Sequence, residues 1–415
     1  MTTTDVPTSE TPGAAPESVE LRSLPHRALD NLRAGDLGLL PIIVALIIIT
    51  AFFTYKNTNF VSGGNYINII VQMAATATIA IGVVFVLLLG EIDLSIGFVS
   101  GVAGVVVAEL QRPDLGIHRI GGIAAILLAV VAGALIGGFQ GSFVAILGVP
   151  SFVVTLAGLL AWQGVILIAL GTQGVIGIQN SLINDLANYY LSHTVGWILA
   201  GVGSLLYAAA TLGAVYNRRR HGIRGDNLAW VVTKVLAFSA LVWLAVGYAN
   251  RDAARGFPFA GLLVIALLVG WQFVAERTTF GRHVYAVGGN AEAARRAGIN
   301  VRFIRLAVFM ISGAMAALGG CIFAARLSSV DLNAGGGTIL LDAISAAVIG
   351  GTSLFGGRGR VRSALFGALV IAMIANGIDL VGYSSGTKFV VTGVILLAAV
   401  TLDTVSRRRL EAAGR

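Results

Sequence analysis

Apolar stretches about as long as a lipid bilayer is thick recur along the whole 415-residue sequence. An α-helix needs roughly 20 apolar residues to cross the hydrocarbon core, and in lipid a backbone must satisfy its own hydrogen bonds. Each stretch therefore predicts a helix, and the chain is expected to be an all-α, polytopic transmembrane bundle. We predict twelve spans, at residues 37–54, 66–89, 93–110, 121–145, 152–170, 195–215, 229–249, 257–274, 304–325, 339–356, 363–382 and 388–404.

Composition agrees with a chain that lies mostly in lipid. Charged residues make up 12% of it and hydrophobic residues 56%, whereas soluble domains carry roughly 25% charged residues. An ordinary soluble enzyme and a disordered chain are both excluded. Glycine is abundant, at 54 residues, which is about twice its usual share of roughly 7%. Within apolar runs, glycine lets helix backbones approach closely, so we expect a compact bundle.

The arginine clusters indicate the orientation of the chain. Each cluster follows an even-numbered span, at residues 218–220, 277–305, 358–362 and 407–409. Cytoplasmic segments collect Lys and Arg, so both termini are predicted to be cytoplasmic. The expected organisation is a partly disordered tail at 1–36, a membrane domain at 37–404 and a second tail at 405–415. The same bias explains the net charge of +8, and no nucleic-acid partner is expected.

A polar break, Gly90-Glu91-Ile92-Asp93-Leu94-Ser95-Ile96-Gly97, separates two of the apolar stretches. Two interpretations remain open. In the first, the break is a short cytoplasmic turn in which Glu91 and Asp93 are solvated and Asp93 or Ser95 caps the next helix. In the second, it is a helix break buried in the bundle, where its polar groups line a cavity.

The longest cytoplasmic loop, residues 275–303, is predicted to contain a helix of about two turns. Asn290 is a favourable N-cap, Glu292 suits the positive first turn, and Arg295 suits the last turn. Gly298 fits the position just beyond the C-terminal end. A helix this short is marginal alone in water, and it lacks the Trp, Phe or Leu that would anchor it in lipid. We therefore predict that it docks on a partner protein.

The longest outer loop, residues 171–194, has a weak helical pattern that ends in Tyr189-Tyr190. Tyrosine favours the membrane interface. A surface helix and an irregular loop are both compatible with this segment.

Polar side chains also recur at membrane depth. They are Gln140, Thr155, Gln163, Asp342, Ser345 and Asn376. Such residues can bond neighbouring helices or line a route for a solute. Asp342 lies only a few residues inside its expected span, so it fits either a cavity or the interface. Trp162 lies between two of these positions and is compatible with packing or with solute contact.

Several motifs are missing from the sequence. It holds no G-x-x-x-x-G-K-[ST] phosphate loop and no H-E-x-x-H zinc motif. Its five histidines are scattered over tail and loops, and Cys321 is the single cysteine, so a disulfide within the chain is excluded. Residues 382–386 match G-x-S-x-G in letters but lie between two apolar spans, away from any strand-to-helix turn. We expect no catalytic residue, metal site or cofactor.

Four segments together resemble the permease family of bacterial ABC importers for simple sugars, the ribose and xylose type. They are EIDLSIG at 91–97, VPSFVVTLAG at 149–158, AVGGNAEAARRAGINV at 286–301 and AVIGGTSLFGGRG at 347–359. The resemblance covers about residues 66–403 and keeps the family's order. Residues 217–258 add an arginine-rich loop and extra apolar sequence, taking ten spans to twelve. This longer form looks most like the xylose branch.

The resemblance implies a passive sugar pathway in a bacterial cell membrane. An external sugar-binding protein would deliver the sugar, two permease chains would form the pathway, and ATP-binding subunits would dock on the cytoplasmic side. The sugar is expected to be xylose or a related pentose. Candidate pathway residues, chosen for polar or aromatic chemistry at membrane depth, are Asp93, Ser95, Gln140, Thr155, Trp162 and Asn376. Candidate ATPase-coupling residues are Gly289, Asn290, Glu292, Ala293, Ala294, Arg295 and Gly298.

Two other classes of protein compete with this interpretation. An ion-coupled secondary transporter usually buries ionisable residues along its pathway, whereas the acidic residues here lie near the ends of the expected spans. A membrane-embedded enzyme would need clustered acids, histidines or metal ligands, and the sequence shows none.

Overall fold

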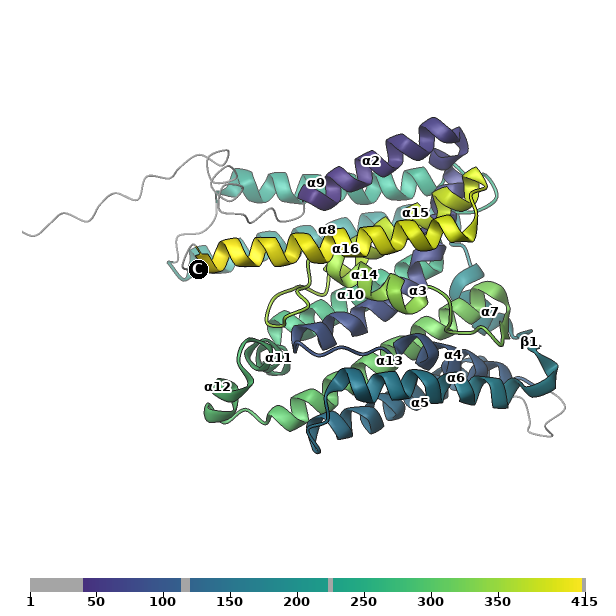
Figure 1. Ribbon diagram of the computed structural model, residues 1–415. Helices are drawn as coiled ribbons and strands as arrows, with labels where there is room; N and C mark the ends of the chain where they lie inside the picture. The colour runs from purple at the N-terminus through teal and green to yellow at the C-terminus, as the bar shows by residue number, and fades with distance from the viewer. Residues whose placement is uncertain (1–39, 113–119, 223–226, 413–415) are drawn as a thin grey trace, which may run out of the picture.

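The protein is seen in a computed structural model that describes residues 40–112, 120–222 and 227–412 (Figure 1). The predicted tail at 1–36 lies outside these residues. The described chain is almost entirely helical, which confirms the all-α prediction.

In the described part of the chain, eight helices are long and apolar enough to cross a membrane by length and composition, and the polytopic prediction is confirmed. They are α3 (Gly63–Leu88), α5 (Gly122–Ala145), α6 (Ser151–Leu170), α8 (His193–Arg220), α9 (Leu228–Ala249), α10 (Phe259–Arg277), α13 (Val301–Leu327) and α15 (Ser363–Val381). The other four apolar stretches form α2 (Leu40–Lys56), α4 (Ile96–Glu109), α14 (Ile339–Ile349) and α16 (Ser385–Ala412).

Two of the predicted spans, 93–110 and 339–356, are wrong in extent. Their helices α4 and α14 have 14 and 11 residues. At 1.5 Å per residue they reach roughly 21 and 16 Å, short of the roughly 30 Å of hydrocarbon. The chain before α4 holds a buried carboxylate, and the chain after α14 is rich in glycine, so neither continues the helix. At the C-terminus the opposite holds, because α16 runs on to Ala412 through part of the expected tail.

The centre of the bundle is α13 packed against α3, α4 and α5. Glycines set its spacing. A Cβ atom on Gly137 of α5 would overlap the carbonyl oxygen of Phe309 in α13, and one on Gly313 of α13 would overlap the carbonyl oxygen of Gly133. The helix backbones therefore lie in direct contact, which confirms the close packing expected from the glycine content.

Helices α8 and α9 form a separate pair at the edge of the bundle. Their indole rings Trp197 and Trp243 stack with centroids 5.2 Å apart, and Tyr207 lies 4.1 Å from Phe238. The pair touches the core near one end, where Tyr248 packs edge-on against Tyr66 of α3 with centroids 5.3 Å apart.

The chain leaves the bundle and returns to it at one place. The N–H of Leu191 donates to the carbonyl of Phe257 (3.0 Å), and the N–H of Phe259 donates to the carbonyl of Tyr189 (2.9 Å). Residues 192–256 thus form a segment outside the bundle whose two ends lie next to each other. The predicted insertion at 217–258 holds α9 but only the last turn of α8, so the peripheral pair begins earlier than the expected boundary.

Short elements cover both ends of the bundle. At one end lie η1 (Thr58–Val61), η3 (Gly171–Gln173), α7 (Ser181–Asn188) and a two-stranded antiparallel sheet of β1 (Val175–Gly177) and β2 (Ser329–Asp331). Helix α7 confirms the helical alternative for the outer loop, and its Ile183 is fully buried. At the other end, α11 (Thr279–Gly289) and α12 (Ala291–Arg296) lie on the same side as the C-terminal end of α16 (Figure 1).

Candidate transport cavity and coupling helix

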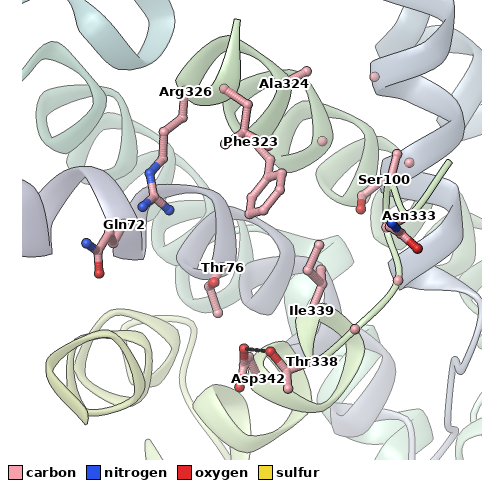
Figure 2. A pocket seen from close by; sticks show the side chains of 18 of the residues that line it. Gln72, Thr76, Ser100, Phe323, Ala324, Arg326, Asn333, Thr338, Ile339 and Asp342 are labelled. Carbon is pink, nitrogen blue, oxygen red and sulfur yellow. Dashed lines mark hydrogen bonds between the residues drawn. The ribbon is translucent and has the colours of Figure 1, made fainter. Parts of the chain in front are cut away.

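A cavity of about 390 Å³ lies between α3, α4, α13, α14 and α15. Polar or charged side chains from all five helices and from the 333–338 loop line it together with the aromatic ring of Phe323 (Figure 2). Its lining includes uncharged polar groups, one aromatic ring and charged groups: Gln72, Thr76, Asn333 and Thr338, then Phe323, then Arg326, Asp331, Asp342, Asp379 and Lys388. The cavity falls within the range of about 300–1,000 Å³ that is typical of small-molecule sites.

One wall of the cavity exists because α4 is lined with glycine. A Cβ on Gly97 would lie 2.7 Å from the carbonyl oxygen of Gly335, and one on Gly101 would overlap the carbonyl oxygen of Ala334. Gly335 has φ +76°, a conformation that residues with a side chain rarely adopt. The loop before α14 can therefore lie directly on α4, and the two short helices border the same space.

Asp342 supplies an acceptor with spare capacity. Its side chain is 8% exposed, and Oδ2 accepts a hydrogen bond of 2.7 Å from Thr338 Oγ1. Oδ1 is buried and accepts from none of the described residues. A buried carboxylate oxygen without a donor is costly. A hydroxyl group of a bound solute could satisfy it.

The polar break before α4 is buried, as the second of its two interpretations expects, but Asp93 and Ser95 are not among the residues that line the cavity. Asp93 is 6% exposed and Ser95 is inaccessible. Oδ1 of Asp93 accepts from the N–H (3.0 Å) and the hydroxyl (2.7 Å) of Ser95, and Oδ2 accepts from Ser312 Oγ of α13 at 2.9 Å. Glu91 lies nearer the surface and pairs with Arg305 at 3.2 Å. The break therefore ties α4 to α13.

Gln140 of α5 completes this cluster. Ser95 Oγ lies 2.8 Å from Gln140 Oε1, while the Nε2 atom of Gln140 is buried with no acceptor among the described residues. A hydroxyl has one proton, and Ser95 already donates it to Asp93. A half-turn of the amide would let Nε2 donate to Ser95 Oγ, so that Ser95 can accept from Gln140 while it donates to Asp93. Asp93, Ser95 and Gln140 thus form one buried hydrogen-bonded cluster.

The other three candidate pathway residues, Thr155, Trp162 and Asn376, do not take part in this cluster. Thr155 Oγ1 donates to the carbonyl of Ser151 at 2.8 Å, and Trp162 packs partly buried against the core. Asn376 accepts from Asn65 Nδ2 at 2.8 Å. None of the six candidates is among the residues that line the described cavity, and their place on a sugar route stays a prediction.

The predicted short helix is present as α12, with both expected ends. Asn290 Oδ1 accepts from the N–H of Ala293 at 2.9 Å, and Gly298 has φ +85°. Glu292 forms ion pairs with Arg295 (2.8 Å) and Arg296 (3.1 Å). Hydrogen bonds from these two arginines hold the pKa of the Glu292 carboxyl below its usual value. These local interactions define a short rigid helix.

Burial divides the candidate coupling residues into two groups. Ala294 is 5% exposed and packs against its own chain, and its carbonyl accepts from the N–H of Ile299 at 3.0 Å. Gly289, Asn290, Glu292, Ala293, Arg295 and Gly298 are exposed. Ala294 therefore supports α12 from beneath, and any docking face consists of the exposed group.

Sequence reasoning overlooked most of the cavity. Asp342 was recognised as a costly membrane-depth carboxyl but stayed outside the candidate set, and Phe323 gave no signal distinct from packing. The useful signal was the glycine spacing of α4, at Gly97, Gly101 and Gly104, together with the glycines of the 335–337 loop. Within the described ranges, no group of three or more His, Cys, Asp or Glu could hold a metal ion.

Comparison with known proteins identifies the family. The family described as the branched-chain amino acid transport system permease component matches residues 65–400, which is most of the chain. This chain belongs to that permease family. It is a multi-pass protein of the cell membrane, and the resemblance found in its motifs is confirmed.

Three relatives of this permease are named for the sugar that they transport. The xylose transport system permease protein of Escherichia coli K12 is 37% identical over 95% of this chain and 98% of the relative, and that of Haemophilus influenzae is 34% identical over 92% and 100%. The ribose import permease protein of Escherichia coli K12 is 31% identical over 87% of this chain and 92% of the relative. No solved structure matches this permease.

Proposed function

We propose that this permease is the membrane subunit of an ATP-driven importer for a monosaccharide, xylose or a related pentose. The observation that carries the proposal is the cavity between α4 and α14, which offers hydrogen-bonding groups and an aromatic ring near a buried carboxylate oxygen to which none of the described residues donates. Relatives named for xylose and ribose, at 37% and 31% identity, support a pentose.

The chemistry of the cavity suits a sugar ring. Sugar hydroxyls are both donors and acceptors, and Gln72, Thr76 and Asn333 can exchange hydrogen bonds with them. The weakly positive C–H face of a sugar packs well on the electron-rich face of an aromatic ring, which Phe323 presents. Asp342 Oδ1 can accept from a hydroxyl. In this proposal the sugar binds transiently in the cavity as it crosses the bundle.

Sugar uptake by the reconstituted importer tests the route. Phe323→Ala and Asp342→Asn should reduce uptake at limiting sugar by up to about tenfold each, since one such contact is worth roughly 0.5–1.5 kcal/mol. Phe273→Ala is a matched control, because Phe273 is 61% exposed on the surface of α10. Normal uptake by both cavity variants would place the route elsewhere. Competition by unlabelled pentoses and hexoses would identify the sugar.

The partners follow from the two ends of the bundle. The end that carries α12 and the basic residues Arg218–Arg220 of α8 is proposed to be cytoplasmic and to bind the ATP-binding subunits. An external sugar-binding protein is proposed to dock at the end that carries α7, and a second permease chain to complete the pathway. Reporter fusions after Arg220 and Arg296 should read cytoplasmic, and one near Asn180 external.

A bulky residue on α12 tests the ATPase contact. Ala293→Trp should block docking of the ATP-binding subunit by steric clash, as in helix-in-groove recognition. Ala209→Trp, on the exposed surface of α8, controls for the added bulk. Ala294→Trp is a poor test because Ala294 is buried within this chain. If Ala293→Trp leaves both ATPase association and uptake intact, α12 is not the contact.

An ion-coupled transporter is the alternative to be excluded. Proteoliposomes that hold the complete complex should take up sugar only with ATP and the binding protein present. Uptake that follows a proton or sodium gradient without ATP would overturn the proposal.

A further inference from the structure

Three backbone segments that are far apart in sequence touch at Gly288, near the end of α11. A Cβ on Gly288 would overlap the carbonyl oxygen of Leu88 and would lie 2.9 Å from the backbone nitrogen of Gly357. The N–H of Gly357 donates to that same carbonyl of Leu88 at 2.8 Å. Gly289, the next residue, has no atom within 4 Å of its Cβ position. A side chain therefore lacks room at Gly288, although the backbone of Gly289 is also close, since a Cβ on Gly357 would lie 3.1 Å from the Cα of Gly289.

Two further glycines, Gly356 and Gly90, pack against the contact at Gly288. A Cβ on Gly356 would lie 2.9 Å from both the carbonyl oxygen of Gly288 and the nitrogen of Gly90. Gly356 and Gly90 have φ of +85° and +74°, so both turns need a residue without a side chain. We call the contact among Leu88, Gly288 and Gly357 the Gly288 joint.

Each segment of the joint leads to a functional element. Gly288 lies three residues before α12. Leu88 ends α3 and precedes the break that starts α4, and Gly357 lies in the loop that follows α14. Helices α4 and α14 are the two short helices that border the cavity, through Gly101 and Asp342 among others. One contact thus joins α12 to both of them.

The connection on the α4 side is stiff. Between Leu88 and α4, the N–H of Ile92 lies 3.2 Å from Ser151 Oγ, and the Asp93 carboxylate is held by Ser312 at 2.9 Å. On the α14 side, Tyr285 of α11 donates from its hydroxyl to the carbonyl of Gly359 at 2.8 Å. A displacement of α11 therefore moves both segments, because close-packed backbone shifts as a unit.

We propose that the Gly288 joint transmits motion of α12 to the two helices that border the cavity, so that ATPase engagement changes the cavity. Gly288 is a positioning residue: it touches neither sugar nor nucleotide. The inference rests on the proposed function, since it needs an ATP-binding subunit on α12. It adds the path by which that subunit and the sugar cavity communicate.

Substitution at the joint should uncouple the two activities. Gly288→Ala must separate α11 from Leu88 and Gly357, although alanine favours the helix itself. We expect the complex to assemble and hydrolyse ATP at its basal rate. Stimulation by sugar-loaded binding protein should fall about tenfold, the scale of a typical coupling free energy. Gly270→Ala, the same change on exposed α10 where nothing lies within 4 Å, should keep full stimulation.

The outcomes separate this inference from the proposed function. If the unchanged complex shows no sugar-stimulated ATP hydrolysis, the proposed function fails. If that complex is stimulated and Gly288→Ala is stimulated equally, the inference is overturned. If Gly288→Ala does not assemble, Tyr285→Phe decides, because it removes only the hydrogen bond to Gly359. Reduced stimulation with normal assembly supports the joint, and full stimulation contradicts it.

Discussion

Helix α3 and the α8–α9 pair have similar hydropathy and opposite environments. In the most apolar window of α3, 89% of the residues are buried, against 11% in α8 and in α9. The glycines also differ: a Cβ on Gly82 of α3 would lie 3.0 Å from Met315 of the core helix α13, whereas Gly203 and Gly213 of α8 have no described atom within 4 Å, and the close contact of Gly247 in α9 is with Trp197 of its own pair. In a membrane, apolar content shows that a helix spans, and glycine at a contact shows where helices pack.

Among single substitutions, the largest expected effect comes from adding bulk at a central glycine. Gly313→Leu should destabilise the protein by about 3 kcal/mol or more, at or above the usual range for overpacking, because the new side chain would overlap the backbone of α5. Gly203→Leu, the same change on α8, should shift stability by no more than about 0.5 kcal/mol. Thermal unfolding in detergent measures both. Equal losses of stability in the two variants would show that α8 is packed as tightly as the centre of the bundle.

A smaller effect is expected from the buried carboxylate of the central region. Asp93→Ala leaves the Ser95 N–H and the Ser312 hydroxyl without their acceptor, and a lost buried partner costs about 1–3 kcal/mol. Asp93→Asn keeps one acceptor oxygen and should lose less. Thermal unfolding and uptake together check the order. If Asp93→Ala is as stable as the unchanged protein, the cluster does not hold α4 to α13.

Local features of the chain were predictable, and contacts between distant segments were not. Apolar runs located the helices, and the ends of α12 followed from Asn290 and Gly298, whose interactions reach only a few residues. The extent of α4 and α14 depended on Ser312 lying beside Asp93, and on Gly335 lying against Gly97. Such pairings are set by tertiary packing, so sequence alone left the buried and solvated interpretations of the 90–97 break equally open.

The same limit explains the outcome for the candidate site. Membrane-depth polarity selected Gln140 and Asn376 because it cannot distinguish a side chain that bonds a neighbouring helix from one that faces a cavity. Both residues have bonding partners within the bundle. Phe323 and Asp342 border a space that exists only because the glycines of α4 admit the 333–338 loop.

Removal of the peripheral pair should have a moderate effect. Residues 192–256 leave and rejoin the bundle at hydrogen-bonded positions, Leu191 and Phe257, so a short Gly-Ser linker can replace them. The shortened protein would lose contacts such as the hydrogen bond from Arg255 to Asn68 but would keep the cavity and the Gly288 joint. We expect it to reach the membrane, unfold at a modestly lower temperature, and retain sugar-stimulated ATP hydrolysis in the complex.

A second deletion tests whether residues 192–256 are more dispensable for folding than a helix of the bundle. Removal of α6, which packs on α4 and contributes Thr155 beside the buried break, should abolish folding. If loss of residues 192–256 also abolishes membrane insertion, the α8–α9 pair belongs to the core despite its exposure.

The smallest expected effect concerns Glu292, an exposed carboxylate that contrasts with buried Asp93. Hydrogen bonds from Arg295 and Arg296 lower the pKa of Glu292 from its usual 4.5. A carboxyl whose pKa is lowered by folding stabilises the folded state fully above the usual pKa and loses that contribution as pH falls through the lowered one. Protection of the α12 amides from hydrogen exchange should therefore weaken slightly as pH falls below 4.5, and exposure to water and salt keeps the change small. Glu292→Gln should remove the pH dependence, and a dependence that persists in this variant would assign it to another group.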